Sequence, residues 1–126
     1  MPGIRQILGA QGERLAARHL RRRGYAIVQR NYRCRHGEID LVALDGGVLV
    51  FVEVKTRAQS QFGLPIEAVD RRKQEQVARV AREFVRQHRL YDRAIRFDVV
   101  GVRRRGWRWE IDVVRNAFDV KGGFCF

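Results

Sequence analysis

The order of hydrophobic patterns along this 126-residue chain predicts an α/β fold in which helices cover a mixed β-sheet. Two segments repeat apolar residues at helical spacing, and five have the short apolar or alternating pattern of strands, in the order α-β-β-β-α-β-β. A chain of this length commonly forms one domain with its own core. We therefore expect a single domain over residues 1–126, with its core over about 8–118 and a C-terminal tail over 119–126.

The first helix is predicted over about Leu8–Arg23. Its apolar residues recur near helical spacing at Leu8, Leu15, Ala16 and Leu20. Gly24 then stands where a glycine commonly ends a helix. The next segment, Tyr25–Arg33, mixes apolar and basic residues and predicts the first strand.

A β-hairpin is predicted next, because the pair Gly46-Gly47 separates two strand-like segments. The segments are Glu38–Asp45 and Val48–Thr56. The polar, glycine-containing residues Arg57–Leu64 predict a loop.

The second helix is predicted from Ile66 or Val69 to His88. Its apolar stripe comprises Val69, Val77, Val80, Ala81, Phe84 and Val85. Two strands follow, over Ala94–Arg103 and Trp107–Val114, joined by a turn at 104–106. Trp107 and Trp109 alternate with charged residues, so we expect both rings on one face of the last strand, packed in the core rather than stacked on bases.

The charge of the chain predicts a polyanionic partner. It carries 26 Lys and Arg against 14 Asp and Glu, a net charge of +12. Basic side chains that meet phosphates release condensed counterions, which favours nucleic-acid binding; the alternative is that the charge only maintains solubility. Two cysteines give no disulfide framework, so a cytoplasmic location is expected, and the longest apolar stretch, Gly46–Val52, is too short to span a membrane.

Two lysines stand out, because only three of the 26 basic residues are lysines. A site that needs a compact ammonium cannot use the planar guanidinium of arginine in its place. Lys121 falls in the expected tail, which leaves Lys55 and Lys73 to be explained.

Ionisable residues interrupt strands that otherwise read as buried. Glu53 and Lys55 lie two apart in an apolar strand, so they point to one face. Pairing of the hairpin strands can bring Asp40 beside Glu53, and two semi-buried carboxylates resist ionisation unless a cation lies between them. Hard oxygen ligands of this kind suit Mg²⁺ or Mn²⁺.

The two helices can add groups to this cluster. Glu13 lies on or beside the inward stripe of the first helix, and Lys73 lies on the inward side of the second. Such a set predicts metal-assisted phosphodiester hydrolysis, with Lys55 orienting water or neutralising charge in the transition state. The alternative is structural: Glu53 pairs with Lys55, and Asp40 bonds to backbone or arginine. Asp98 is expected to pair with an arginine, and no zinc-ligand spacing is present.

An ordered set of motifs between Gly12 and about Val100 resembles the bacterial YraN family, endonuclease-like proteins similar to archaeal Holliday-junction resolvases of the PD-(D/E)XK nuclease superfamily. The motifs are Gly12-Glu13 with Ala16, Gly24-Tyr25, Asn31–Arg33, Gly37–Leu41, Phe51–Arg57, Lys73 and Arg96–Asp98. The proline of the superfamily motif is replaced here by Ile39, directly before Asp40.

The resemblance implies a restriction-endonuclease-like fold in which Asp40, Glu53 and Lys55 match the catalytic triad of the superfamily. Glu13 matches the first-helix acid of the resolvase branch, so the metal ligands are expected to be Asp40, Glu53 and Glu13. Thr56, Arg57 and Lys73 are candidates for binding the nucleic acid, although a strand end entering a loop needs no such role.

The function expected from this set is a Mg²⁺- or Mn²⁺-dependent endonuclease acting on DNA, with branched or structured DNA among the candidate substrates. The alternative is a nucleic-acid-binding protein that retains the nuclease fold without turnover. Because resolvase-like proteins act as two-fold dimers on four-way junctions, a homodimer is also an expectation.

Overall fold

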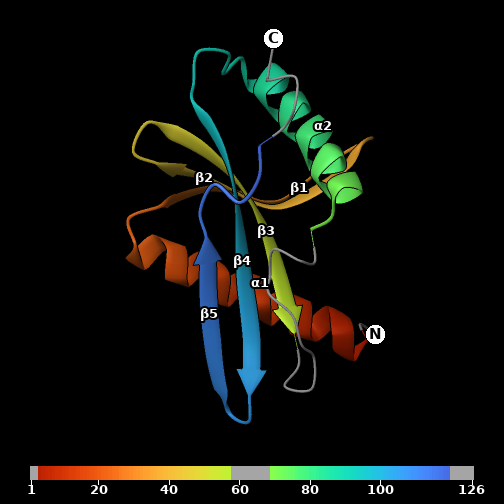
Figure 1. The fold of residues 1–126 in the computed structure, drawn as a ribbon, viewed down its shortest axis with the longest axis vertical. Coiled ribbons are helices and arrows are strands. Elements are labelled where there is room, and N and C mark those ends of the chain that lie inside the picture. Colours follow the sequence, from red (N-terminus) through yellow and green to blue (C-terminus); the bar gives the residue numbers. More distant parts are fainter. Residues whose placement is uncertain (1–2, 58–68, 120–126) are drawn as a thin grey trace.

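The computed structural model describes residues 3–57 and 69–119, and the predicted element order is confirmed (Figure 1). The elements are α1 (Ile4–Arg22), β1 (Ala26–Cys34), β2 (Gly37–Asp45), β3 (Val48–Arg57), α2 (Arg71–His88), β4 (Ile95–Arg105) and β5 (Arg108–Val114). The loop predicted from Arg57 begins later, since Arg57 is still in β3; residues 58–64 and the predicted helix start at Ile66 lie outside the described residues. So does the predicted tail from residue 120 onward.

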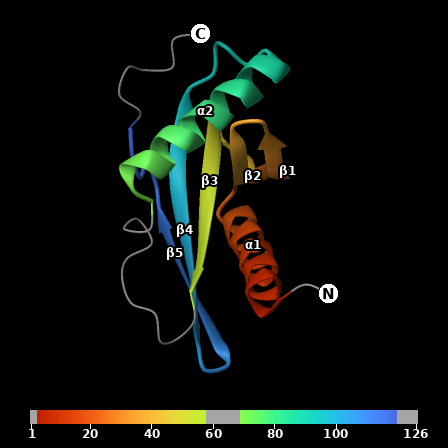
Figure 2. The ribbon, with the colours of Figure 1, turned by 90° about the vertical axis from the view of Figure 1, so that its right-hand side faces the viewer.

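The five strands form one mixed sheet in the order β1-β2-β3-β4-β5. β3 and β4 are parallel, and the other neighbouring pairs are antiparallel. Because parallel neighbours need a crossover, the connection between β3 and β4 carries α2 across one face of the sheet. α1 covers the opposite face (Figure 2).

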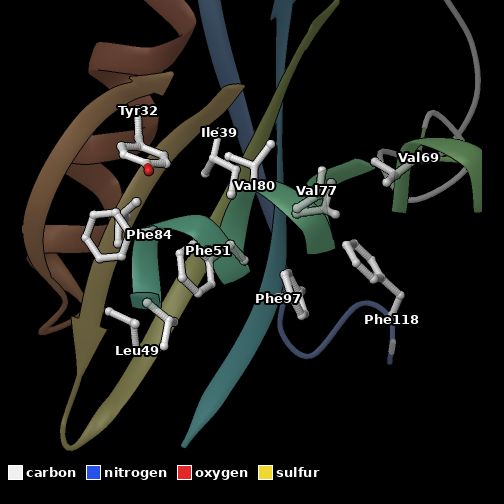
Figure 3. Close-up of a cluster of buried hydrophobic side chains, with 14 residues drawn as sticks. Tyr32, Ile39, Leu49, Phe51, Val69, Val77, Val80, Phe84, Phe97 and Phe118 are labelled. Carbon is white, nitrogen blue, oxygen red and sulfur yellow. The ribbon is translucent and has the colours of Figure 1, made fainter. Parts of the chain in front are cut away.

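Each helix closes its own hydrophobic core. On the α2 face, the ring of Phe51 lies between those of Phe84 and Phe97, with centroids 5.8 Å from each (Figure 3). All six residues of the predicted stripe are buried there. On the α1 face, Leu20 packs with Leu41 and Val52. This packing makes β3 the central strand, buried on both faces.

The helix ends follow from their sequence. The Asp70 side chain accepts the backbone N–H of Lys73 at 2.9 Å, which caps α2 just after Val69. Gly24 has a φ of 94°, so it ends α1 in the left-handed conformation that glycine adopts most easily. No helix among the described residues is both long and apolar enough to cross a membrane.

The prediction that Trp107 packs in the core is wrong, since this residue is 83% exposed. Arg105 pairs with Arg108, so the turn consists of Gly106 and Trp107 and lies further along the chain than predicted. Gly106 has a φ of 60°, which suits the first position of a two-residue type II′ turn. Trp109 does lie partly buried against the α1-face core.

Asp98 is buried and structural, as predicted. Its carboxylate accepts hydrogen bonds from Arg96 Nε at 2.9 Å and from the Tyr25 hydroxyl at 2.8 Å. Arg96 also bridges to Asp45, 2.9 Å away. The network ties the start of β4 to the β2–β3 turn and to the segment after α1, and each buried charge in it is paired.

Candidate active site

The sheet opens between β2 and β3 at Asp40. Residue pairing between the two strands runs from Asp45 and Val48 to Leu41 and Val52. Beyond that point the Asp40 carboxylate, rather than a strand carbonyl, accepts the backbone N–H of Val54, 2.7 Å from Oδ2. This part of the structural alternative, a bond from Asp40 to backbone, is therefore observed.

The alternation of β2 breaks at the same residue. Ile39 packs in the α2-face core and Leu41 in the α1-face core, although residues two apart in a regular strand share a face. Ile39 is visible among the α2-face side chains in Figure 3. The break leaves Asp40 at the gap between the strands, where groups from both faces of the sheet can approach it.

Glu53 is unusual because it is an ionisable residue buried in the sheet. It is only 4% exposed, in the middle of the apolar strand β3. Its Oε2 lies 3.8 Å from Lys73 Nζ, while its Oε1 is buried with no hydrogen-bond partner. The pKa of Glu53 is raised from 4.5 to about 7, first by burial and then by the nearby Asp40 carboxylate, while the charges of Lys73 and Lys55 oppose the rise. Near neutral pH this side chain is therefore poised between its two protonation states.

Asp40 belongs to the same electrostatic unit. Burial raises its pKa above the ordinary range, while the bond from Val54 N–H and the charge of Lys55 lower it. The structure thus brings the two predicted carboxylates together in a place with little water. Acids paired in this way favour a proton or a cation between them.

Both lysines that the composition singled out lie at this cluster. Lys73 comes from the first turn of α2 and forms the ion pair with Glu53. Lys55 shares the face of Glu53 and lowers the pKa of both carboxylates, yet it forms no ion pair with any described residue. The Glu53–Lys55 ion pair of the structural alternative is thus absent from the described part of the chain.

Glu13 reaches the cluster from the α1 side. Burial raises the pKa of its carboxyl, Asp40 raises it further, and a hydrogen bond with Asn31 lowers it. Among the neighbouring charges, Asp40 also has the largest effect on the pKa of Glu53. Asp40 therefore interacts electrostatically with both Glu13 and Glu53, which approach it from opposite faces of the sheet.

The residues fit a divalent cation in part. Within residues 3–57 and 69–119, no three His, Cys, Asp or Glu side chains are grouped closely enough to hold a metal by themselves. Mg²⁺, however, is usually bound by one or two carboxylates, with waters and substrate phosphates completing its shell. Asp40 and the unpartnered Oε1 of Glu53 meet that need. Glu13 as a third ligand remains a prediction.

Thr56 has a structural contact that the sequence did not reveal. It lies against Gly12 of α1, where an added Cβ would clash with Thr56 Oγ1. The glycine thus lets α1 approach the end of β3 and positions Glu13, the next residue, near Asp40. Arg57 is half-buried at the end of β3, beside Arg103 of β4. Phosphate binding by Thr56 and Arg57 remains a prediction.

An arginine-lined groove leads away from the cluster along α2, and sequence reasoning missed it. A cavity of about 400 Å³ is lined by Asp70, Arg72, Lys73, Gln76 and Arg79. Arg79 is shared with a hollow of about 560 Å³, lined by Arg35, His36, Arg79, Arg82, Glu83, Arg86 and Tyr91. The sequence feature that could have predicted the groove is the seven-residue spacing of Arg72, Arg79 and Arg86, which places these arginines on one stripe of the helix.

Comparison with known proteins gives a consistent result. A model of the "Uncharacterised protein family UPF0102" matches residues 12–102. A UPF0102 protein of Geobacter metallireducens is 44% identical over 113 residues, covering 90% of this chain and 93% of the relative. Another from Chlorobaculum tepidum is 46% identical over 123 residues, covering 91% and 94%. One from Beutenbergia cavernae is 50% identical over 97 residues, covering 77% and 82%.

Proposed function

This chain belongs to the UPF0102 family, the YraN-like proteins, and from its carboxylate–lysine cluster we propose that it is a metal-dependent endonuclease that hydrolyses DNA phosphodiester bonds. Branched or structured DNA is the substrate class that the resemblance to resolvases favours. The observation that carries the proposal is the buried Glu53, whose Oε1 has no partner, beside Asp40 and opposite Lys73.

This cluster is costly if its role is only structural. Two neighbouring carboxylates lose water on folding and repel one another, and apolar residues of similar size would commonly stabilise the same place. The Asp98 network shows the contrast, because there each buried acid oxygen has a donor. A cation-binding role explains why Glu53 keeps an oxygen without a donor.

The roles of the residues follow from their positions. Asp40 and Glu53 would hold the divalent cation, which when bound polarises a phosphate and lowers the pKa of an attacking water. Lys73 favours the ionised form of Glu53, which is the form that binds metal. Lys55, with no carboxylate partner among the described residues, is available to orient water or to neutralise charge on the phosphate in the transition state.

The groove along α2 supports a nucleic acid as the substrate. It begins at Lys73, within reach of Glu53, and continues past Arg79 to Arg86. A row of guanidinium groups beside the cluster suits a phosphate backbone passing over it. The net charge of +12 adds a general attraction for polyanions.

The test is cleavage of labelled duplex, single-stranded and four-way-junction DNA with Mg²⁺ or Mn²⁺. Wild type should cut at least one substrate, and Glu53→Gln, which keeps the shape and removes the charge, should not. Glu75→Gln is the matched control, because Glu75 is exposed on α2 and, within residues 3–57 and 69–119, forms an ion pair only with Arg71 one turn away. Cutting that survives Glu53→Gln would mean contamination or a misplaced site.

The second candidate is a nucleic-acid-binding protein without turnover, and the groove of arginines is what favours it. Such a protein would bind DNA in a salt-sensitive way, identically in wild type and Glu53→Gln, and would cut none of the substrates. Its affinity would not depend on Mg²⁺, whereas the endonuclease should bind Mn²⁺ through Asp40 and Glu53 and lose that binding in Asp40→Asn.

A further inference from the structure

The β4–β5 hairpin extends beyond the rest of the sheet. β3 ends at Arg57, opposite Arg103, while β4 continues to Arg105 and the turn follows. Figures 1 and 2 both show this hairpin projecting past α1 at the end of the sheet. The tip therefore stands away from both hydrophobic cores.

The tip carries an aromatic ring that folding does not use. Tryptophan is highly buried on average, yet Trp107 is 83% exposed, the most exposed large hydrophobic residue in the described part of the chain. The guanidinium of Arg108 lies 5.2 Å from its ring centroid. Even with that contact, most of the ring surface meets water.

The surroundings of the ring are cationic. Residues 103–112 hold four arginines against one glutamate and one aspartate. Arg104 lies over the ring of Trp109 at 5.8 Å, and Arg105 pairs with Glu110 at 3.2 Å. Aromatic faces mixed with guanidinium groups are the combination by which proteins hold single-stranded nucleic acids.

β3 and β4 run side by side from the carboxylate cluster toward the tip. Glu53 is paired with Val99 of the parallel strand β4. The turn residues Gly106 and Trp107 lie seven to eight residues further along β4, which is roughly 23–27 Å at strand spacing. At about 3.4 Å per nucleotide, the rise of a stacked DNA strand, this distance corresponds to about seven or eight nucleotides.

We propose that Trp107 stacks on an unpaired base of the DNA strand whose phosphate lies at the Asp40–Glu53 cluster. The inference rests on the proposed function and names its substrate more closely: DNA with a single-stranded segment about seven or eight nucleotides from the cut. Stacking needs an exposed base face, so the interior of a continuous duplex cannot make this contact. Base–aromatic stacking also tolerates any base, because every base has a π-face.

Fluorescence tests the stacking without relying on cleavage. The chain has two tryptophans, so Trp109→Phe leaves Trp107 as the only reporter, and Glu53→Gln in the same chain prevents cutting. We expect duplex DNA with a single-stranded overhang to quench the emission, and a blunt duplex of equal length to leave it nearly unchanged. A thermal melt of each variant checks that it is folded.

Affinity gives the second measurement. Loss of one base–aromatic stack in Trp107→Ala should weaken overhang binding about 5- to 150-fold, while Trp107→Phe retains most of the affinity. Blunt-duplex affinity should change little in either variant. An equal loss on both DNAs would overturn the proposal, because the tip would then supply only general attachment.

Other outcomes separate this inference from the proposed function. In one outcome, wild type cuts no DNA while overhang DNA still quenches the Trp107 emission and Trp107→Ala still binds overhang DNA more weakly than wild type. That result would refute the endonuclease proposal and support the stacking proposal. If wild type cuts while overhang DNA leaves Trp107 emission unchanged, the stacking is refuted alone. Quenching by anionic lipid vesicles but not by DNA, or self-association lost in Trp107→Ala, would assign the tip to a membrane surface or a second copy and overturn the proposal.

Discussion

Replacing Glu53 with glutamine should stabilise the protein above neutral pH. The pKa of Glu53 is raised to about 7 from an ordinary value of 4.5, so the folded state binds a proton that the unfolded state has lost between those pH values. Stability therefore falls as pH rises from 4.5 to 7, and at 1.36 kcal/mol per unit the loss is about 3 kcal/mol. Glu53→Gln has no such titration and should keep that stability at pH 8.

Urea unfolding at pH 5 and pH 8, with EDTA present, measures this difference. Wild type should lose stability between the two pH values, and the variant should lose much less; a smaller decline persists because the Asp40 pKa is raised as well. The exposed control Glu75→Gln should behave as wild type. A variant no more stable than wild type at pH 8, with the same pH dependence, would refute the assignment of Glu53 as a destabilised carboxylate.

Three further predictions concern neighbouring features. Gly12→Ala should destabilise the fold by about 1–3 kcal/mol in urea, because the new methyl group meets Thr56; unchanged stability would contradict that close approach. Lys73→Met should raise the pKa of Glu53 and shift Mn²⁺ binding to higher pH in calorimetric titrations, whereas an unshifted curve would remove Lys73 from the site. Arg79→Ala should weaken binding to all DNAs alike and lower the salt slope by about one, and an unchanged slope would exclude the groove from the DNA path.

The sequence predicted the elements well because their signals are local. Helical periodicity, the Gly46-Gly47 turn and the glycine after α1 act within a few residues, and the structure confirms each. Strand alternation likewise placed Glu53 and Lys55 on one face. These features need no knowledge of distant contacts.

The features that sequence reasoning missed depend on tertiary contacts or on strand register. The sheet opens at Asp40 because the carboxylate of Asp40 accepts the hydrogen bond from the backbone N–H of Val54. No local sequence pattern predicts this break in the alternation of side chains along β2. At Trp107 the alternating pattern was present, but Gly106 placed that residue in the turn instead of the strand. The arginines of the groove along α2 form a stripe that can be found in the sequence, but such a stripe predicts a solvent-exposed helix face as readily as a binding groove.

The parallel pairing of β3 with β4 has a consequence for folding kinetics. β2 and β3 form a local hairpin around a two-residue turn, whereas β4 joins β3 only after the chain has passed through α2. Local contacts form at a lower entropic cost than distant ones, so Asp40 and Glu53 can meet while still hydrated. Their dehydration belongs to the later docking of α2 and β4. We therefore expect a rise in pH to accelerate unfolding and to leave formation of the β2–β3 hairpin nearly unaffected, because the repulsion develops only when α2 and β4 dock.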